Sequence, residues 1–117
     1  MTTKDIWDEW ERIALDYLKR HWYTFVAKNF RFSIFWEVDI ICEKNDETVF
    51  VEVKYRYNDK FWAPEDYITS SKKWKLLKTI QYYISKNNIS DESIRFDIIC
   101  INKKLWKLIH YKRQSLE

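Results

Sequence analysis

Glycine is absent from this chain of 117 residues, whereas a typical protein of this length would contain about eight glycines. Tryptophan, by contrast, occurs seven times, while proline occurs once and cysteine twice. Cys42 and Cys100 lie within apolar runs, and neither belongs to a Cys-x-x-Cys pair or a Cys/His cluster. We therefore expect reduced thiols in the core, and the cysteine pattern argues against a disulfide or a metal site built on thiols.

Long apolar runs are also missing. No segment approaches the roughly 18 apolar residues of a membrane-spanning helix, and the N-terminal segment is charged and amphipathic, unlike a signal peptide. We therefore expect a cytoplasmic protein with no membrane partner. The chain is too short for two domains and has 46% hydrophobic residues, which predicts a single folded domain over residues 1–117.

The hydrophobic pattern predicts two helices and several strands. Apolar residues at helical spacing follow the candidate N-caps Thr2 and Thr3 and predict a helix near residues 4–20. A longer helix is predicted to begin at Pro64 and to end at Asn87-Asn88. Runs rich in β-branched and aromatic residues predict strands at residues 23–35 (as one strand or two pieces), 37–42, 48–54, 95–101 and 105–111.

These elements follow one another in the order α-β-β-β-α-β-β. The strands at 37–42 and 48–54 are separated by a polar segment centred on Asn45-Asp46, two residues that tolerate positive φ, so this part of the chain predicts a hairpin. Strands on either side of the second helix can share one sheet through a β-α-β crossover. The pattern predicts an α/β fold, a mixed β-sheet flanked by helices.

Charged residues interrupt two of the predicted apolar strands. Glu37 and Asp39 precede an apolar run in the first strand of the hairpin, and Glu52 and Lys54 alternate with valines in the second. Buried strand positions are costly for charge, and residues two apart share a face of the strand. If the strands pair, three carboxylates and one ammonium group therefore converge at adjacent strand ends.

Clustered carboxylates repel one another unless a cation neutralises them, and oxygen-only ligands favour Mg²⁺ or Mn²⁺. A lysine two residues from a metal-binding glutamate can hold an attacking water or stabilise charge that develops on a phosphate. The spacing Asp39-x12-Glu52-x-Lys54 therefore points to metal-assisted hydrolysis of phosphodiesters. The alternative is that Glu52 and Lys54 form an ordinary edge-strand pair facing solvent.

This pattern resembles the PD-(D/E)XK nuclease superfamily and, more closely, the YraN-type family of bacterial proteins that are similar to Holliday-junction resolvases. The resemblance implies a restriction-endonuclease-like fold and an endonuclease that acts on DNA, and a preference for branched DNA rests on analogy alone. The motifs that carry it span nearly the whole chain: residues 10–18, 36–41, 50–56, 68–72, 95–97 and 109–110.

The resemblance also assigns roles to individual residues. It implies that Asp39 and Glu52 bind the metal together with the carbonyl of Val53, and that Lys54 assists the water. Glu11 approaches from the first helix as a further catalytic and metal-binding residue, unless it is an ordinary polar residue beside Trp10. Glu37 would contact the metal ligands rather than the metal. The superfamily often has proline before the aspartate, where this chain has Val38.

The net charge of +3 means that an anionic partner must meet a local basic patch. Lys72, Lys75 and Lys78 supply one at the start of the second helix, next to Trp74, and would contact DNA phosphates without reading bases. A solvated helix face is the alternative, and a second basic group lies between Lys103 and Arg113. A catalytically silent nucleic-acid-binding or scaffold module and an accessory protein acting through partners remain alternative functions, and the sequence also allows a homodimer.

In the family that this chain resembles, glycine commonly occupies the positions of five of the tryptophans: Trp7, Trp10, Trp22, Trp36 and Trp62. An indole cannot replace glycine, which permits positive φ and close backbone approach. Certain bacterial lineages read the codon UGA as glycine, whereas another translation table reads it as tryptophan. We therefore interpret these tryptophans as misdecoded glycines, and if they are literal, Trp10 and Trp36 crowd the predicted site.

Overall fold

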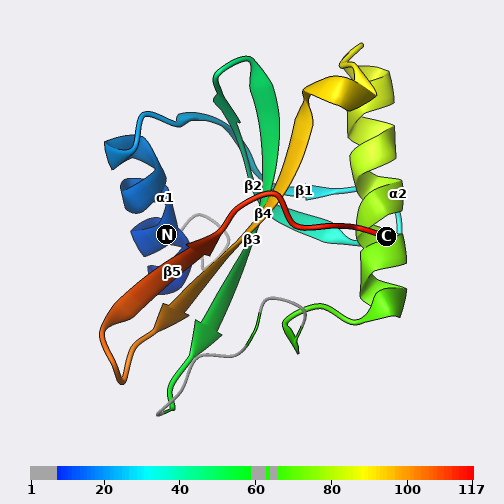
Figure 1. Ribbon diagram of the computed structural model, residues 1–117. Coiled ribbons are helices and arrows are strands. Elements are labelled where there is room, and N and C mark those ends of the chain that lie inside the picture. The colour runs from blue at the N-terminus through cyan, green and yellow to red at the C-terminus, as the bar shows by residue number, and fades with distance from the viewer. Residues whose placement is uncertain (1–7, 59–62, 64–65) are drawn as a thin grey trace, which may run out of the picture.

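Two helices cover opposite faces of a five-stranded sheet in the part of the chain described by the computed structural model, residues 8–58, 63 and 66–117 (Figure 1). A short 3-10 helix, η3 (Asp91–Ser93), precedes the fourth strand. The predicted α/β class and the order α-β-β-β-α-β-β are confirmed. The elements are α1 (Glu9–Arg20), β1 (Thr24–Arg31), β2 (Glu37–Lys44), β3 (Glu47–Arg56), α2 (Ser70–Lys86), β4 (Ile94–Asn102) and β5 (Lys107–Tyr111).

The strands lie in the sheet in chain order, from β1 to β5. β3 and β4 are parallel and the other neighbours are antiparallel, so the sheet is mixed as predicted. β2 and β3 form the predicted hairpin, whose turn at Asn45 and Asp46 has φ values of 50° and 65°. A parallel pair needs a long crossover, and the segment containing α2 supplies it between β3 and β4.

Alternating side chains of the central strands separate two hydrophobic clusters. Val49 and Val51 of β3 pack on the α1 side of the sheet with Ala14 and Leu18, while Phe50 packs on the other side with residues of α2. Because side chains alternate along a strand, Glu52 and Lys54 lie on the same face as Phe50, the face that α2 covers. The sheet therefore directs the predicted catalytic pair towards α2.

Several predicted boundaries were wrong. α1 begins at Glu9 after Asp8, not near residue 4, and α2 begins at Ser70, not at Pro64. The side chain of Thr69 accepts a hydrogen bond from the backbone N–H of Lys72, so this threonine caps α2 and sets its start. The proposed caps Thr2 and Thr3, Pro64 itself, Trp7 and Trp62 lie outside the described residues.

The strand predictions were closer. The predicted segment 23–35 contains one strand, β1, which ends at Arg31, and a turn over residues 103–106 delays the start of β5 to Lys107. Both cysteines are free and buried, which confirms the prediction of reduced core thiols. None of the helices in the described residues is both long and apolar enough to cross a membrane.

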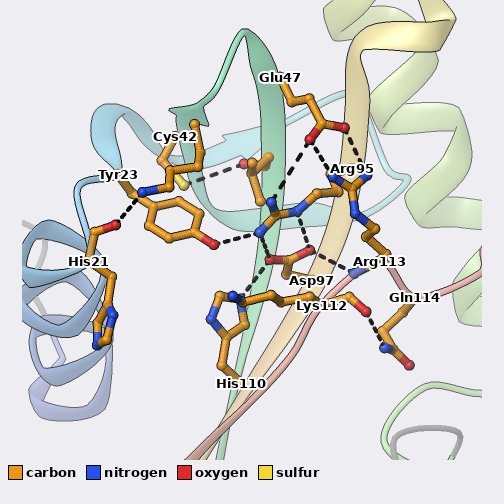
Figure 2. Close-up of polar contacts among 12 residues, drawn as sticks. His21, Tyr23, Cys42, Glu47, Arg95, Asp97, His110, Lys112, Arg113 and Gln114 are labelled. Carbon is orange, nitrogen blue, oxygen red and sulfur yellow. Dashed lines mark hydrogen bonds and ion pairs between the residues drawn. The ribbon is translucent and has the colours of Figure 1, made fainter.

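A buried cluster of charges lies on the α1 side of β4 (Figure 2). The carboxylate of Asp97 is fully buried and accepts hydrogen bonds from the Arg95 side chain at 2.6 and 3.0 Å. It also accepts bonds from the His110 ring at 2.6 Å and the Arg113 backbone N–H at 3.0 Å. These donors hold the pKa of Asp97 below its ordinary value despite burial. The cluster therefore ties β4, β5 and the C-terminal segment together.

The same cluster reaches α1 through His110. An ionised carboxylate can only accept, so the Nε2 atom of His110 carries the proton towards Asp97, and in the neutral ring Nδ1 accepts from the Tyr17 hydroxyl at 3.0 Å. Arg95 donates in turn to the Tyr23 hydroxyl at 2.6 Å. These contacts give His110 a structural position that links α1 to the sheet.

Candidate active site

The predicted site residues of the β2–β3 hairpin line a common cavity. The cavity has a volume of about 440 Å³ and opens between the ends of β2 and β3 and the segment that precedes β2. Asp39, Glu52 and Lys54 line it, and Glu37 lies beside them. The remaining wall is formed by Arg31, Phe35, Trp36 and Val53. The structure therefore brings four of the sequence-predicted residues to one place.

Asp39 is held in position by the neighbouring strand. Its Oδ2 atom accepts a hydrogen bond of 2.7 Å from the backbone N–H of Val53, one residue beyond Glu52. Burial raises the pKa of Asp39 to about 6, although the bond from Val53 and the charge of Lys54 oppose the rise. Dehydration is therefore the main cost of ionising this carboxylate.

Glu52 is almost completely buried, with 2% of its surface exposed. Its Oε1 atom is buried and has no hydrogen-bond partner among the residues that the structure describes. Its Oε2 atom lies 3.9 Å from the ammonium nitrogen of Lys54. Burial, and then the negative charge of Asp39, raises the pKa of Glu52 well above its ordinary value, although the charge of Lys54 and the nearby indole N–H of Trp36 oppose the rise. Glu52 thus has an unsatisfied acceptor atom, and its ionisation next to Asp39 is unfavourable. We refer to Asp39 and Glu52 as the acid pair.

These residues fit the oxygen donor set that a hard divalent cation prefers. A cation between Asp39 and Glu52 would satisfy the unpaired Oε1 atom and offset the charge of Asp39 that contributes to the raised pKa of Glu52. Within residues 8–58, 63 and 66–117, no group of three or more His, Cys, Asp and Glu side chains is placed to hold a metal ion. The structure accordingly presents a pair of carboxylates rather than a complete side-chain cage.

Glu11 lies close to this pair but does not line the cavity. It is buried on α1, and burial, a hydrogen bond shared with Asp8 and the charge of Asp39 raise its pKa to about 7. The amide of Asn29 connects it to the site, since in the orientation that satisfies both partners its nitrogen donates to Glu11 at 3.1 Å and to Glu37 at 3.0 Å. Glu11 as a metal ligand remains a prediction.

Glu37 contacts Arg31 and Asn29 next to the acid pair. Its Oε2 atom accepts a hydrogen bond of 2.8 Å from Arg31, and its other oxygen faces Asn29. Glu37 also contributes to the rise in the pKa of Asp39. This position, beside the acid pair and within contact distance of Asn29 and Arg31, is compatible with the supporting role expected for Glu37.

Trp36 forms a wall of the cavity and is tied to α2. The hydroxyl of Thr79 accepts from the backbone N–H of Trp36 at 3.1 Å and lies 2.8 Å from its carbonyl oxygen. The amines of Lys54 and Lys72 lie 5.8 and 5.5 Å from the indole centre. These contacts fix the segment that precedes β2 against the helix, and the large ring takes up space next to the acid pair.

The predicted DNA-binding lysines lie on α2. Lys72 and Lys75 are exposed and Lys78 is half-buried, and none of the three has a carboxylate partner within the described ranges. The second basic group differs, because Lys103 pairs with Glu9 and Arg113 with Glu47. Among the described residues the three α2 lysines are not neutralised in this way, and the amine of Lys72 lies against Trp36 of the cavity wall.

Sequence reasoning missed three residues that shape the site. It did not mark Arg31, Asn29 or Thr79 as site residues. A lone polar residue in a strand or helix has no periodic signal that marks it. The positive φ of 53° at Asn29 is a local hint, because asparagine tolerates that conformation better than most residues.

Comparison with known proteins gives the family. The model of the Uncharacterised protein family UPF0102 matches residues 10–101, a span that contains every site residue predicted from the sequence. The chain belongs to the UPF0102 family. A UPF0102 protein of Clostridioides difficile is 40% identical over 99 residues, which cover 85% of this chain and 86% of the relative. UPF0102 proteins of Thermodesulfovibrio yellowstonii and Clostridium botulinum are 40% and 35% identical over 104 and 113 residues, covering 89% and 93% of this chain and 91% and 92% of the relatives.

Membership in UPF0102 confirms the YraN-type family that the sequence motifs predicted. The matches cover most of this chain and most of each relative. The names of these relatives state no activity. A functional conclusion therefore has to come from the chemistry of the cavity.

Proposed function

We propose that this UPF0102 protein is a divalent-metal-dependent nuclease that hydrolyses phosphodiester bonds of DNA in the cytoplasm. The observation that carries the proposal is the pair of half-buried Asp39 and buried Glu52, whose pKa values are raised mainly by burial and whose Oε1 atom on Glu52 has no hydrogen-bond partner among the described residues. Lys54 lies 3.9 Å from Glu52 in the same open cavity. This combination suits chemistry on a phosphate better than structural packing.

Each residue has a defined task in this proposal. Asp39 and Glu52 would hold Mg²⁺ or Mn²⁺, which supplies a more acidic water and stabilises charge on the phosphate. Lys54 orients the attacking water and stabilises the negative charge that grows on the phosphate oxygens. Glu37 and Asn29 hold the neighbouring side chains of Arg31 and Glu11 in place. The lysines of α2 bind the DNA backbone.

Two finer parts of the proposal rest on analogy. Branched DNA is the substrate form suggested by the likeness of YraN-type proteins to resolvases. A resolvase-like enzyme would cut two strands of a junction, which favours a homodimer with two such cavities. The cleavage panel below includes four-way DNA, and sedimentation with and without that DNA measures the oligomeric state.

A catalytically silent nucleic-acid-binding or scaffold module is the second candidate. Trp36 favours it, because the indole forms part of the cavity wall beside Asp39 and Glu52. A side chain of this size reduces the room for a phosphate and for the waters of a metal ion. The two candidates differ in metal-dependent cleavage and in metal-dependent stability.

The test is a cleavage panel of linear, flapped and four-way DNA with Mg²⁺, Mn²⁺ or EDTA. We expect wild-type cleavage only with metal. Glu52→Gln should lose at least about 100-fold in rate because it removes charge from the metal-binding pair, and Lys54→Ala should lose a similar factor. Glu92→Gln, a matched change at an exposed position on η3, should cleave like the wild type.

Melting temperature separates the roles of the two residues. A metal that binds only the folded state contributes about 2.7 kcal/mol at one hundred times its Kd, so the wild-type midpoint should rise with metal concentration. Glu52→Gln should abolish that rise, whereas Lys54→Ala should retain it. A wild-type protein with neither metal-dependent stabilisation nor cleavage of any DNA form would support the silent module instead.

A further inference from the structure

A row of four aromatic rings runs over α2 and the segment before β2. Tyr82 stacks on Phe32 with the ring centres 4.1 Å apart and the planes within 8°. Phe32 stacks on Phe35 with the ring centres 5.4 Å apart. Phe35 and Trp74 form a T-shaped pair with the ring centres 5.6 Å apart. The mutual contacts hold the rings in fixed positions, so we treat Tyr82, Phe32, Phe35 and Trp74 as one surface, the aromatic row.

The aromatic row is open to solvent at both ends. Trp74 is 52% exposed and Tyr82 is 37% exposed, which is unusual for rings that could pack in the core. Phe30 and Tyr83 show the contrast, because they pack against the buried cluster on the same face of the sheet. A structural role in the core therefore does not account for the outer members of the row.

Lysines accompany the exposed rings. The amine of Lys78 lies 5.5 Å from the Trp74 ring centre, and that of Lys86 lies 5.7 Å from the Tyr82 ring centre. Lys75 is exposed one helical turn before Lys78. Exposed rings beside cationic side chains match the needs of a single nucleic-acid strand, whose bases stack on aromatic faces while its phosphates contact lysines.

Phe35 joins the aromatic row to the candidate active site. Its ring is a member of the row, and the residue also lines the cavity that contains Asp39 and Glu52. A strand lying along the row would therefore be led to the acid pair. A closed duplex could not use the row in this way, because its base faces are covered by neighbouring base pairs.

We propose that the aromatic row binds unpaired DNA bases, which makes single-stranded flanks next to a duplex the substrate class of this protein. The inference rests on the proposed nuclease function for the cleavage step, but the binding step can be measured without it. The positive surroundings argue against a neutral apolar partner. Duplex DNA and a second copy of this chain are the competing occupants that the experiment must distinguish.

Binding is measured in EDTA, so that cleavage plays no part. Fluorescence anisotropy compares a labelled oligo(dT) strand with a blunt hairpin duplex of the same number of nucleotides, at one fixed salt concentration. Wild-type protein should bind the single strand more tightly. Trp74→Ala and Tyr82→Ala should each weaken single-strand binding roughly 5- to 150-fold, the range reported by alanine substitution of stacking residues. Duplex binding should change little.

Trp106→Ala is the matched control. Trp106 is also strongly exposed, at 77%, but it lies in the β4–β5 turn and shares a cavity with Ile13 of α1, not with the aromatic row. Equal binding of single strand and duplex by the wild type, or equal effects of all three substitutions, would overturn the inference. Dissociation of a wild-type dimer by Trp74→Ala or Tyr82→Ala, with single-strand affinity unchanged, would also overturn it and assign the row to self-association.

Cleavage is then assayed with Mg²⁺ on flapped and blunt duplexes. Selective loss of flap cleavage by Trp74→Ala and Tyr82→Ala supports the inference. Equal cleavage of both duplexes by wild type and variants overturns the inference while leaving the nuclease proposal intact. Tight single-strand binding that depends on Trp74 and Tyr82, without cleavage of any DNA, supports the aromatic row and rejects the nuclease proposal.

Discussion

Trp22 and Trp106 occupy a backbone conformation that suits glycine. Their φ values are 68° and 52°, and their side chains are 84% and 77% exposed. After α1, the backbone N–H of Tyr23 bonds the carbonyl of Leu18 and that of Trp22 bonds Lys19, the pattern in which glycine commonly ends a helix. Asn88 holds the equivalent place after α2 with a φ of 55°. A bulky residue at such a position is an outlier.

Replacing either tryptophan with glycine should therefore stabilise the protein. We expect Trp22→Gly and Trp106→Gly each to raise the free energy of unfolding by about 1 kcal/mol, measured by urea denaturation. Trp74→Gly is the control and should lower stability, because Trp74 lies within α2 and glycine costs about 1 kcal/mol in a helix interior. Destabilisation by all three changes would contradict this account.

The same positions bear on the decoding hypothesis. Trp22 is one of the five tryptophans assigned to glycine from the sequence, and the structure adds Trp106 on conformational grounds. UGA codons at these positions in the coding DNA would agree with that hypothesis, and UGG codons would reject it. If Trp36 is glycine, the wall of the cavity beside Asp39 opens and the argument for a silent module weakens.

Individual site residues were predictable where they broke a strong pattern. Asp39, Glu52 and Lys54 stood out because charge interrupts apolar strands, and the structure places all three around one cavity. Arg95 and Asp97 carry the same signal within β4, but their partners His110 and Arg113 come from later in the chain and could not be assigned without the fold. Asn29 interrupted no apolar pattern, so the sequence did not mark it as a site residue.

At the scale of elements, α2 connects the cavity to the predicted DNA-binding lysines. Thr79 holds Trp36 on one side of the helix, and Lys72, Lys75 and Lys78 lie in its first turns and middle. The helix was predictable from its apolar spacing, but its first residue was not, because Pro64 is an attractive helix start and only the fold shows that Thr69 makes the cap. The hairpin was predicted more accurately, since the turn and strand signals agreed.

The lysines of α2 make a quantitative prediction. If they neutralise DNA phosphates, the double variant Lys72→Ala/Lys75→Ala should bind DNA more weakly and reduce the slope of log K against log salt by roughly two units, with no change in sequence preference. Anisotropy titrations at four salt concentrations measure the slope. Lys104→Ala/Lys112→Ala, the same charge change near the C-terminus, is the control, and a flattened slope only in that control would move the DNA surface to the C-terminal lysines.

At the scale of the whole molecule, the Asp97 cluster links elements that are far apart in the chain. Asp97→Asn should destabilise the protein by about 3–5 kcal/mol, because Arg95 would remain buried with its main charged partner neutralised. Arg113→Ala removes only the exposed pair with Glu47 and should cost at most about 1 kcal/mol. Urea denaturation of both variants measures the difference, and equal losses would contradict the assignment of Asp97 as the centre of the cluster.

The acid pair predicts how stability depends on pH without metal. The pKa of Asp39 is raised in the folded state to about 6, so the folded protein binds more protons than the unfolded chain between about pH 4 and pH 6. Stability should therefore fall as the pH rises through this window, on the order of 3 kcal/mol from Asp39. The pKa of Glu11, about 7, extends the fall towards neutral pH.

Urea denaturation in EDTA at pH 4, 5, 6, 7 and 8 measures this fall. Asp39→Asn keeps an acceptor for the backbone N–H of Val53 but cannot ionise, so its stability curve should be flatter than that of the wild type. Parallel curves for the two proteins would mean that Asp39 titrates normally in the fold.

The hairpin geometry also sets the order in which the site assembles during folding. Asp39 and Glu52 belong to strands joined by a tight turn, and hairpins form in roughly 1–10 μs, whereas the parallel pairing of β3 with β4 must close a long loop. The two carboxylates therefore meet while water still screens them, and Glu52 is buried only when α2 packs on the Phe50 face of the sheet. The repulsion between Asp39 and Glu52 therefore becomes strong only after the folding transition state. It should raise the unfolding rate more than it lowers the folding rate.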